Sequence, residues 1–156
     1  MRIRPAIWIA VVVVACVQAA AAKDIALISN KDNSAKNISL PELVKICKGQ
    51  SLRWADGRLL TVVIREPSAP DMKIVLQKVY GMTAGEVNEL IASANHGRSD
   101  RPAIVVVSSD DTLVKKVGSI PGAVGLVDVY SITGGINVLK VGGKLPLEPG
   151  YVLHGN

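Results

Sequence analysis

The chain has 156 residues, and its 18 lysine and arginine residues against 13 aspartate and glutamate residues give a formal net charge of +5. Because the basic residues are scattered, this mild excess excludes the clustered basic surface of a nucleic-acid-binding protein. The sequence lacks HExxH, GxSxG, P-loop and CxxC motifs, which removes the usual local support for hydrolysis and dithiol redox chemistry. We therefore expect a binding protein, not an enzyme, and assign no catalytic residue, metal ligand or cofactor.

The first 22 residues have the three parts of an export signal. They are Arg2 and Arg4 at the start, an apolar run over residues 6–17, and small residues before Lys23. The apolar run is shorter than the roughly 20 residues that cross a bilayer, so we expect no stable membrane span in the mature chain. The signal predicts a periplasmic or secreted protein that begins near Lys23.

Two alternatives remain open for residues 1–22. In the first, the segment is not cleaved and serves as an N-terminal anchor helix. In the second, Val13-Val14-Ala15-Cys16 acts as a degenerate lipoprotein box, and the mature protein is anchored through an acylated Cys16. The mass of the exported protein distinguishes these outcomes.

The remaining residues, 23–156, are sufficient for one domain with its own core and too few for two. Loss of Arg2 and Arg4 with the signal leaves 16 basic against 13 acidic residues, a formal charge of +3 that can attract small anions. Cys47 is the only cysteine of this part, so an internal disulfide is excluded. We expect Cys47 to pack as a small apolar side chain.

The mature chain begins with a predicted strand and a predicted helix. Ile25–Ser29 is an apolar run that leads into a polar turn. Ser39, followed three residues later by Glu42, forms a capping box, and Gly49 supplies a cap after the last apolar residue. Apolar residues between them recur at the 3.6-residue spacing that gives a helix one buried face.

A strand, a polar loop and a second helix follow. The Asp56-Gly57 pair favours a turn, and Leu60–Ile64 has the length and composition of a buried strand. The loop Arg65–Ser68 leads to a helix that we expect to begin near Ala69-Pro70 and to end at Gly81. In α/β proteins, anion sites lie where a strand leads through a short loop to a helix N-terminus.

Helices and strands continue to alternate in the second half. The predicted elements are a helix from the Thr83–Glu86 capping box to Asn95, a buried strand over 103–107, a helix from a cap at 108–111 to Val117, and strands over 124–127 and 136–141, with residues 144–147 pairing back. Asp110 and Asp111 diverge by about 100° on a helix, so we interpret them as caps and not as an acid–base pair.

This alternation predicts an α/β fold with one sheet of about five strands covered by helices. Parallel neighbours in such a sheet are joined by right-handed crossovers. The inward positions of the predicted elements give a core of Leu43, Val44, Cys47, Val62, Ile64, Leu76, Val105, Val107, Val124 and Leu126.

Five short motifs in order resemble those of the periplasmic substrate-binding proteins of phosphate ABC transporters. They are Asn30-Lys31-Asp32-Asn33, Ile38-Ser39-Leu40-Pro41-Glu42-Leu43, Gly49, Trp54-Ala55-Asp56-Gly57 and Pro121-Gly122-Ala123-Val124-Gly125. The resemblance covers most of residues 25–140 and implies a type 2 periplasmic-binding fold. Because those proteins have two lobes that close on the ligand, residues 23–156 would form about one lobe.

The resemblance also implies an anion site after the strand over residues 61–64. The family has a Ser-Gly-Thr-Arg type loop here, whereas this chain has Ser68-Ala69-Pro70-Asp71, in which only the serine persists. Pro70 has no N–H to donate, and Asp71 is negative where arginine is expected. In the alternative interpretation, Ser68 caps a helix with Asp71 as its partner and no ligand is bound.

The candidate ligand-binding residues are Arg65, Ser68, Ala69, Arg98 and Arg101. The two later arginines lie with His96 in a polar loop, for which a solvated connection is the alternative, with His96 at a helix C-terminus. The first hypothesis is an exported module that binds phosphate, another small oxyanion or an envelope protein. The second is a ligand-free accessory or sensory protein of the envelope that keeps the fold, and an unrecognised enzyme is the third.

Overall fold

The computed structural model describes residues 23–155. The predicted signal peptide, its cleavage site and the two alternatives for residues 1–22 lie outside this part. The described strands are β1 (Ile25–Asn30), β2 (Asn37–Ile38), β3 (Thr61–Arg65), β4 (Ile104–Val107), β5 (Ala123–Asp128) and β6 (Ile136–Val141). The α-helices are α1 (Leu40–Cys47), α2 (Lys73–Val75), α3 (Ala84–Asn95) and α4 (Asp110–Ser119), and the other helical turns are η1 (Pro70–Met72), η2 (Leu76–Tyr80) and η3 (Val129–Ser131).

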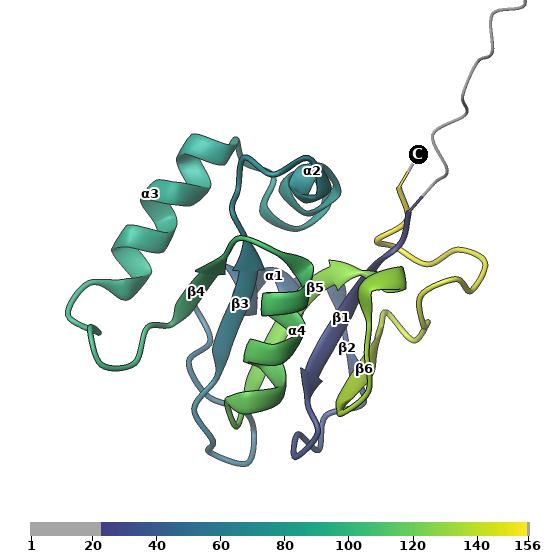
Figure 1. Ribbon diagram of the computed structural model, residues 1–156, viewed down its shortest axis with the longest axis horizontal. Helices are drawn as coiled ribbons and strands as arrows, with labels where there is room; N and C mark the ends of the chain where they lie inside the picture. Colours follow the sequence, from purple (N-terminus) through teal and green to yellow (C-terminus); the bar gives the residue numbers. More distant parts are fainter. Residues whose placement is uncertain (1–22, 156) are drawn as a thin grey trace, which may run out of the picture.

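The strands form one six-stranded sheet in the order β2-β6-β1-β5-β3-β4. β3 pairs in parallel with both β4 and β5, whereas β1 is antiparallel to β5 and to β6. α4 covers one face of the sheet and α1 lies behind the other (Figure 1). The α/β fold is confirmed, and the sixth strand is the two-residue β2, which is too short for a hydrophobic pattern to predict.

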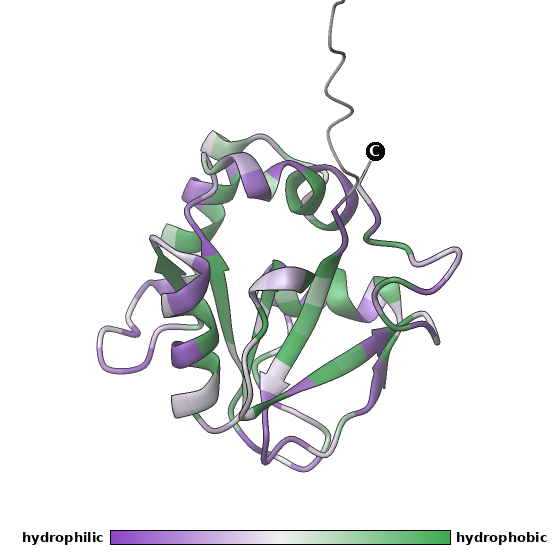
Figure 2. Ribbon diagram, turned by 45° about the vertical axis from the view of Figure 1, so that its right-hand side comes forward, coloured by the Kyte–Doolittle hydropathy of each residue, from purple (hydrophilic) through white to green (hydrophobic). Residues whose placement is uncertain are grey.

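Alternate residues of the central strands point into two separate cores, one on each face. Val62 and Ile64 of β3 pack in the larger core with α1 and the C-terminal segment, whereas Val63 packs against α4. Because both faces are covered, β1, β3 and β5 are apolar along nearly their whole length, as Figure 2 shows. Strands that are buried on both faces appear in the sequence as continuous apolar runs, which is why these three strands could be predicted.

Seven of the ten predicted core residues are buried, and Val44, Leu76 and Val105 are only partly so. The prediction that Val105 lies in a central, buried strand is wrong, because β4 is the edge strand of the sheet. Val106 of the same strand is 39% exposed. β4 still reads as a buried strand in the sequence, since an apolar run does not show how many neighbours the strand has.

The predicted helix from Ala69 to Gly81 is replaced by the series η1, α2 and η2. Ala69 begins it with no side-chain cap, so the interpretation of Ser68 as a helix cap is wrong. Gly81, with φ 61°, donates its N–H to the Leu76 carbonyl five residues back and ends the segment in a widened turn. Residues 144–147 contribute one isolated bridge from Lys144 and no strand.

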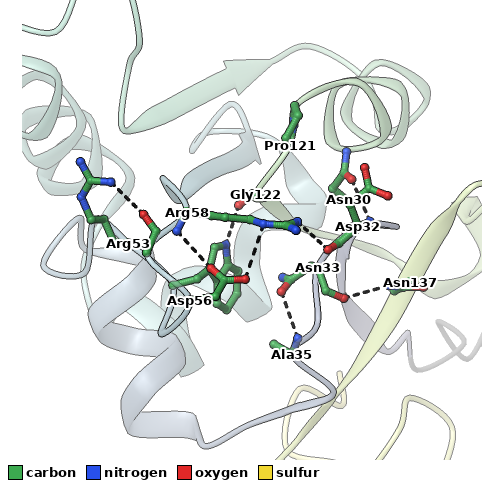
Figure 3. Close-up of polar contacts among 12 residues, drawn as sticks. Asn30, Asp32, Asn33, Ala35, Arg53, Asp56, Arg58, Pro121, Gly122 and Asn137 are labelled. Carbon is green, nitrogen blue, oxygen red and sulfur yellow. Dashed lines mark hydrogen bonds and ion pairs between the residues drawn. The ribbon is translucent and has the colours of Figure 1, made fainter.

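Three of the five motifs that carried the resemblance, at residues 30–33, 54–57 and 121–125, meet at one end of the sheet, where β1 ends and β5 begins (Figure 3). Arg58 donates to the Asp32 carbonyl, Asn137 donates to the Asn33 carbonyl, and the Trp54 indole donates to the Gly122 carbonyl. At Gly122, φ is +80° and a β-carbon would lie 2.0 Å from the Leu59 carbonyl oxygen, so glycine is required there. These motifs hold the fold together at the end opposite Arg65.

Candidate functional site

Charged side chains gather at the other end of the sheet, where the parallel strands end and α4 begins. The carboxyl-edge cluster consists of Lys23, Arg65, Asp71, Asp110, Asp128 and Ser131. Arg65 is the last residue of β3, Asp128 is the last residue of β5, and Asp110 is the first residue of α4. The crevice beyond the carboxyl ends of parallel strands is the usual ligand-binding position in open α/β sheets.

Arg65 is the central cation of this cluster. Its Nη1 lies 2.6 Å from Asp110 Oδ1 and 3.5 Å from Asp71 Oδ2, and both Arg65 and Asp110 are only 18% exposed at the side chain. Its Nε is buried and has no hydrogen-bond partner among the described residues. The Arg65 charge is therefore already compensated by the protein's own carboxylates, although one N–H remains free.

The remaining members complete a chain of ion pairs. Lys23 Nζ lies 3.3 Å from Asp128 Oδ2 and 3.8 Å from Asp71 Oδ1. The hydrogen bond and charge of Asp128, followed by the charge of Asp71, raise the pKa of Lys23 above its ordinary value. With two cations and three carboxylates, the cluster has a formal charge of −1, which disfavours an additional anion.

Of the predicted ligand residues, only Arg65 belongs to the carboxyl-edge cluster. Ser68 and Ala69 instead line an open groove of about 500 Å³ together with Lys73, Leu76 and other residues. The Ala69 N–H is used within the loop, since it donates to the Glu66 carbonyl at 2.9 Å. The loop therefore does not direct a row of free N–H groups toward Arg65.

Arg98 and Arg101 lie at the opposite end of the sheet from Arg65. They precede β4, whose first residue pairs with Val62 near the start of β3, whereas Arg65 ends β3. Both line a cavity of about 130 Å³, and Arg101 donates to the Pro121 carbonyl at 3.4 Å. The structure therefore does not bring them together with Arg65 or Ser68. His96 caps the C-terminus of α3, as the alternative interpretation of this loop states.

Sequence reasoning missed a second pair of polar side chains in contact, Asp24 and His154. His154 Nδ1 lies 2.5 Å from Asp24 Oδ1, and Asp24 Oδ2 accepts the Leu147 N–H at 2.6 Å. Leu147 has φ +71°, a conformation unusual for leucine, and the surrounding cavity measures about 310 Å³. These contacts hold the C-terminal segment against β1. The partners are 130 positions apart in the chain, and no local pattern connects them.

Within residues 23–155, no group of three histidine, cysteine or carboxylate side chains is placed to hold a metal ion. Cys47 is buried, and burial raises the pKa of its thiol to about 12, so the thiolate nucleophile does not form near neutral pH. In the same part of the chain, no helix combines the length and apolar character needed to cross a membrane.

Comparison with known proteins finds similarity in structure alone. No family model and no curated protein matches the sequence significantly. An ABC-type phosphate transport receptor from Vibrio cholerae superposes with a TM-score of 0.66 at 19% identity, over 86% of this chain and 54% of that chain. PstS from Borrelia burgdorferi gives a TM-score of 0.66 at 19% identity, over 86% and 55%.

A third solved structure is a putative phosphate ABC transporter substrate-binding protein from Clostridium perfringens with bound phosphate. It gives a TM-score of 0.63 at 20% identity, over 78% of this chain and 46% of that chain. This chain thus spans about half the length of the structures it matches. At such low identity the similarity defines the fold, and the chain has the fold of the substrate-binding proteins of phosphate ABC transporters, over about one lobe.

Proposed function

We propose that the chain is an exported, solute-binding-like module of the cell envelope that contacts a protein partner and does not carry free phosphate. The observation that supports the absence of phosphate transport is the pairing of Arg65 with Asp110 and Asp71 inside the protein. The fold supports a periplasmic location and a binding role, in agreement with the export signal expected for residues 1–22.

Electrostatics argue against a tight phosphate site at the carboxyl edge. Two unit charges about 5 Å apart repel by roughly 3 kcal/mol at an effective dielectric constant of about 20, which is about two orders of magnitude in affinity. Phosphate beside Arg65 would meet such repulsion from Asp71 and would also compete with Asp110 for the guanidinium. We therefore expect a dissociation constant for phosphate no better than about millimolar.

Calorimetric titration of the purified exported protein with phosphate and sulfate tests this proposal. We expect no saturable heat below about 1 mM for either anion. Asp71→Arg replaces a repelling charge next to Arg65 with an attracting one, and it should tighten phosphate binding about tenfold or more if the loop keeps its family geometry. Micromolar binding by the unmodified protein would overturn the proposal.

The protein partner is tested by site-specific photocrosslinking in cells. Tyr130 is 75% exposed and follows Asp128 of the carboxyl-edge cluster, so a photoreactive residue at Tyr130 samples this edge. Ala55, exposed in the turn at the opposite end of the sheet, is the matched control position. We expect a discrete envelope protein to be crosslinked from position 130 and not from position 55. Equal labelling from both positions would contradict a partner at this edge.

Binding of a small oxyanion is the second candidate function, because the buried Nε of Arg65 has no partner among the described residues. A free guanidinium N–H is a suitable donor for an oxyanion. The calorimetric titration distinguishes the two candidates, since this function requires saturable binding by the unmodified protein.

A further inference from the structure

We propose that Asp110 is a built-in substitute for a bound anion: its carboxylate fills a site formed by Arg65 and Ser131 beside the N-terminus of α4, and thereby excludes free anions. This inference rests on the proposed function, because it explains why the carboxyl edge does not take up free phosphate. It concerns the unmodified chain, in which the site is occupied by the protein itself.

Each oxygen of the Asp110 carboxylate has a donor from a different part of the fold. Oδ1 lies 2.6 Å from Arg65 Nη1 at the end of β3, and Oδ2 accepts the Ser131 hydroxyl of η3 at 2.8 Å. A guanidinium and a hydroxyl beside the N-terminus of a ten-residue helix are the groups that bind free anions in many proteins. Here a side chain of the same molecule takes that position.

Asp110 is not needed to cap α4. Ser109 is the N-cap residue, and its hydroxyl accepts the Thr112 N–H at 3.1 Å. The neighbouring Asp111 is exposed, whereas the Asp110 side chain is 18% exposed and directed to Arg65 and Ser131. The carboxylate of Asp110 therefore serves contacts between separate elements, which corrects its interpretation as a simple helix cap.

Arg65 has a further hydrogen-bond donor that Asp110 does not use. Arg65 Nε is buried and has no hydrogen-bond partner among the described residues, in addition to the Nη1 that binds Asp110. An Asp110→Ala substitution would free Nη1 and the Ser131 hydroxyl and leave space of the size of one carboxylate group. Formate, the smallest carboxylate, is the closest match to the group removed, so a small monoanionic carboxylate is the ligand class that the emptied site should accept.

Thermal unfolding of the Asp110→Ala protein in sodium formate tests the inference, with sodium chloride at equal concentration as the ionic control. We expect 200 mM formate to raise its Tm by roughly 5 °C relative to chloride, in a saturable manner. The unmodified protein and the Asp111→Ala protein should show no such difference. Addition of Arg65→Met to Asp110→Ala should abolish the response, because the guanidinium is the main donor.

If Asp110→Ala does not fold in chloride, near-UV circular dichroism replaces the Tm, and formate but not chloride should restore the native signal. Equal effects of formate and chloride in either assay would overturn the inference, as would the same formate response in Asp111→Ala. These experiments test the inference and not the proposed function. The proposed function is contradicted instead if the unmodified protein binds phosphate tightly or has no partner at the carboxyl edge.

Discussion

The strength of the Arg65–Asp110 pair can be measured by a double-mutant cycle with Arg65→Met and Asp110→Asn. At the observed distance of 2.6 Å, the Coulomb attraction is about 6 kcal/mol at an effective dielectric constant of about 20. Lost hydration of two charges that are each 18% exposed offsets part of this attraction. We expect a coupling free energy of about 2 to 4 kcal/mol, within the range measured for close charge pairs.

A matched control exists in the same protein. Arg58 and Asp56 form an ion pair at 3.5 Å, with side chains 49% and 37% exposed, so their coupling should be below about 1 kcal/mol. Urea unfolding of the two sets of single and double variants gives both values. Because burial protects the first pair from screening, 0.5 M salt should weaken it proportionally less than the control pair. A coupling for Arg65–Asp110 no larger than that of the control would refute the idea that Asp110 neutralises Arg65.

Three further predictions concern the framework. Gly122→Ala should lower the free energy of unfolding by about 3 kcal/mol or more in urea unfolding, whereas Gly135→Ala should lower it by only about 1 kcal/mol. Both glycines have a positive φ, but only at Gly122 would a β-carbon lie 2.0 Å from a backbone oxygen. Burial raises the pKa of Cys47 from 9.0 to about 12, so the thiol loses its proton at a lower pH in the unfolded chain than in the folded protein. The free energy of unfolding should therefore fall as the pH rises from 8 to 10, and it should fall less in the Cys47→Ala protein. Val63→Asp should lower the free energy of unfolding by more than about 4 kcal/mol and Val105→Asp by about half as much, because Val63 is fully buried and Val105 lies on the edge strand. Equal losses in the two variants would contradict the strand order.

Most elements could be predicted from the sequence because their signals act within a few residues. Thr83 and Glu86 do bond to each other's backbone N–H groups as a capping box, and Ser39 accepts the Glu42 N–H at the start of α1. The strand over residues 136–141 has the predicted bounds. The resemblance was equally accessible, since its motifs are turns and caps, and the structural similarity to phosphate-binding proteins confirms it at the level of the fold.

The candidate site could be predicted only in part. Arg65 can be predicted because it opens the loop after the strand over residues 60–64, but Asp110 lies 45 positions away and Ser131 a further 21, and no spacing rule connects them. Arg98 and Arg101 were grouped with Arg65 by charge alone, whereas the parallel pairing of β3 and β4 places them at the other end of the sheet. The sequence shows which charges are present, and the strand order decides which of them meet.

The central claim, that Arg65 is held by the protein's own carboxylates and does not receive free phosphate, is tested most directly by an NMR titration of the unmodified protein. The Nε–Hε resonance of Arg65, assigned with the Arg65→Lys variant, reports on the guanidinium itself. Phosphate up to about 1 mM should leave this resonance unchanged after correction for ionic strength. A saturable shift with a midpoint in the micromolar range would show that phosphate binds at Arg65 and would contradict the account.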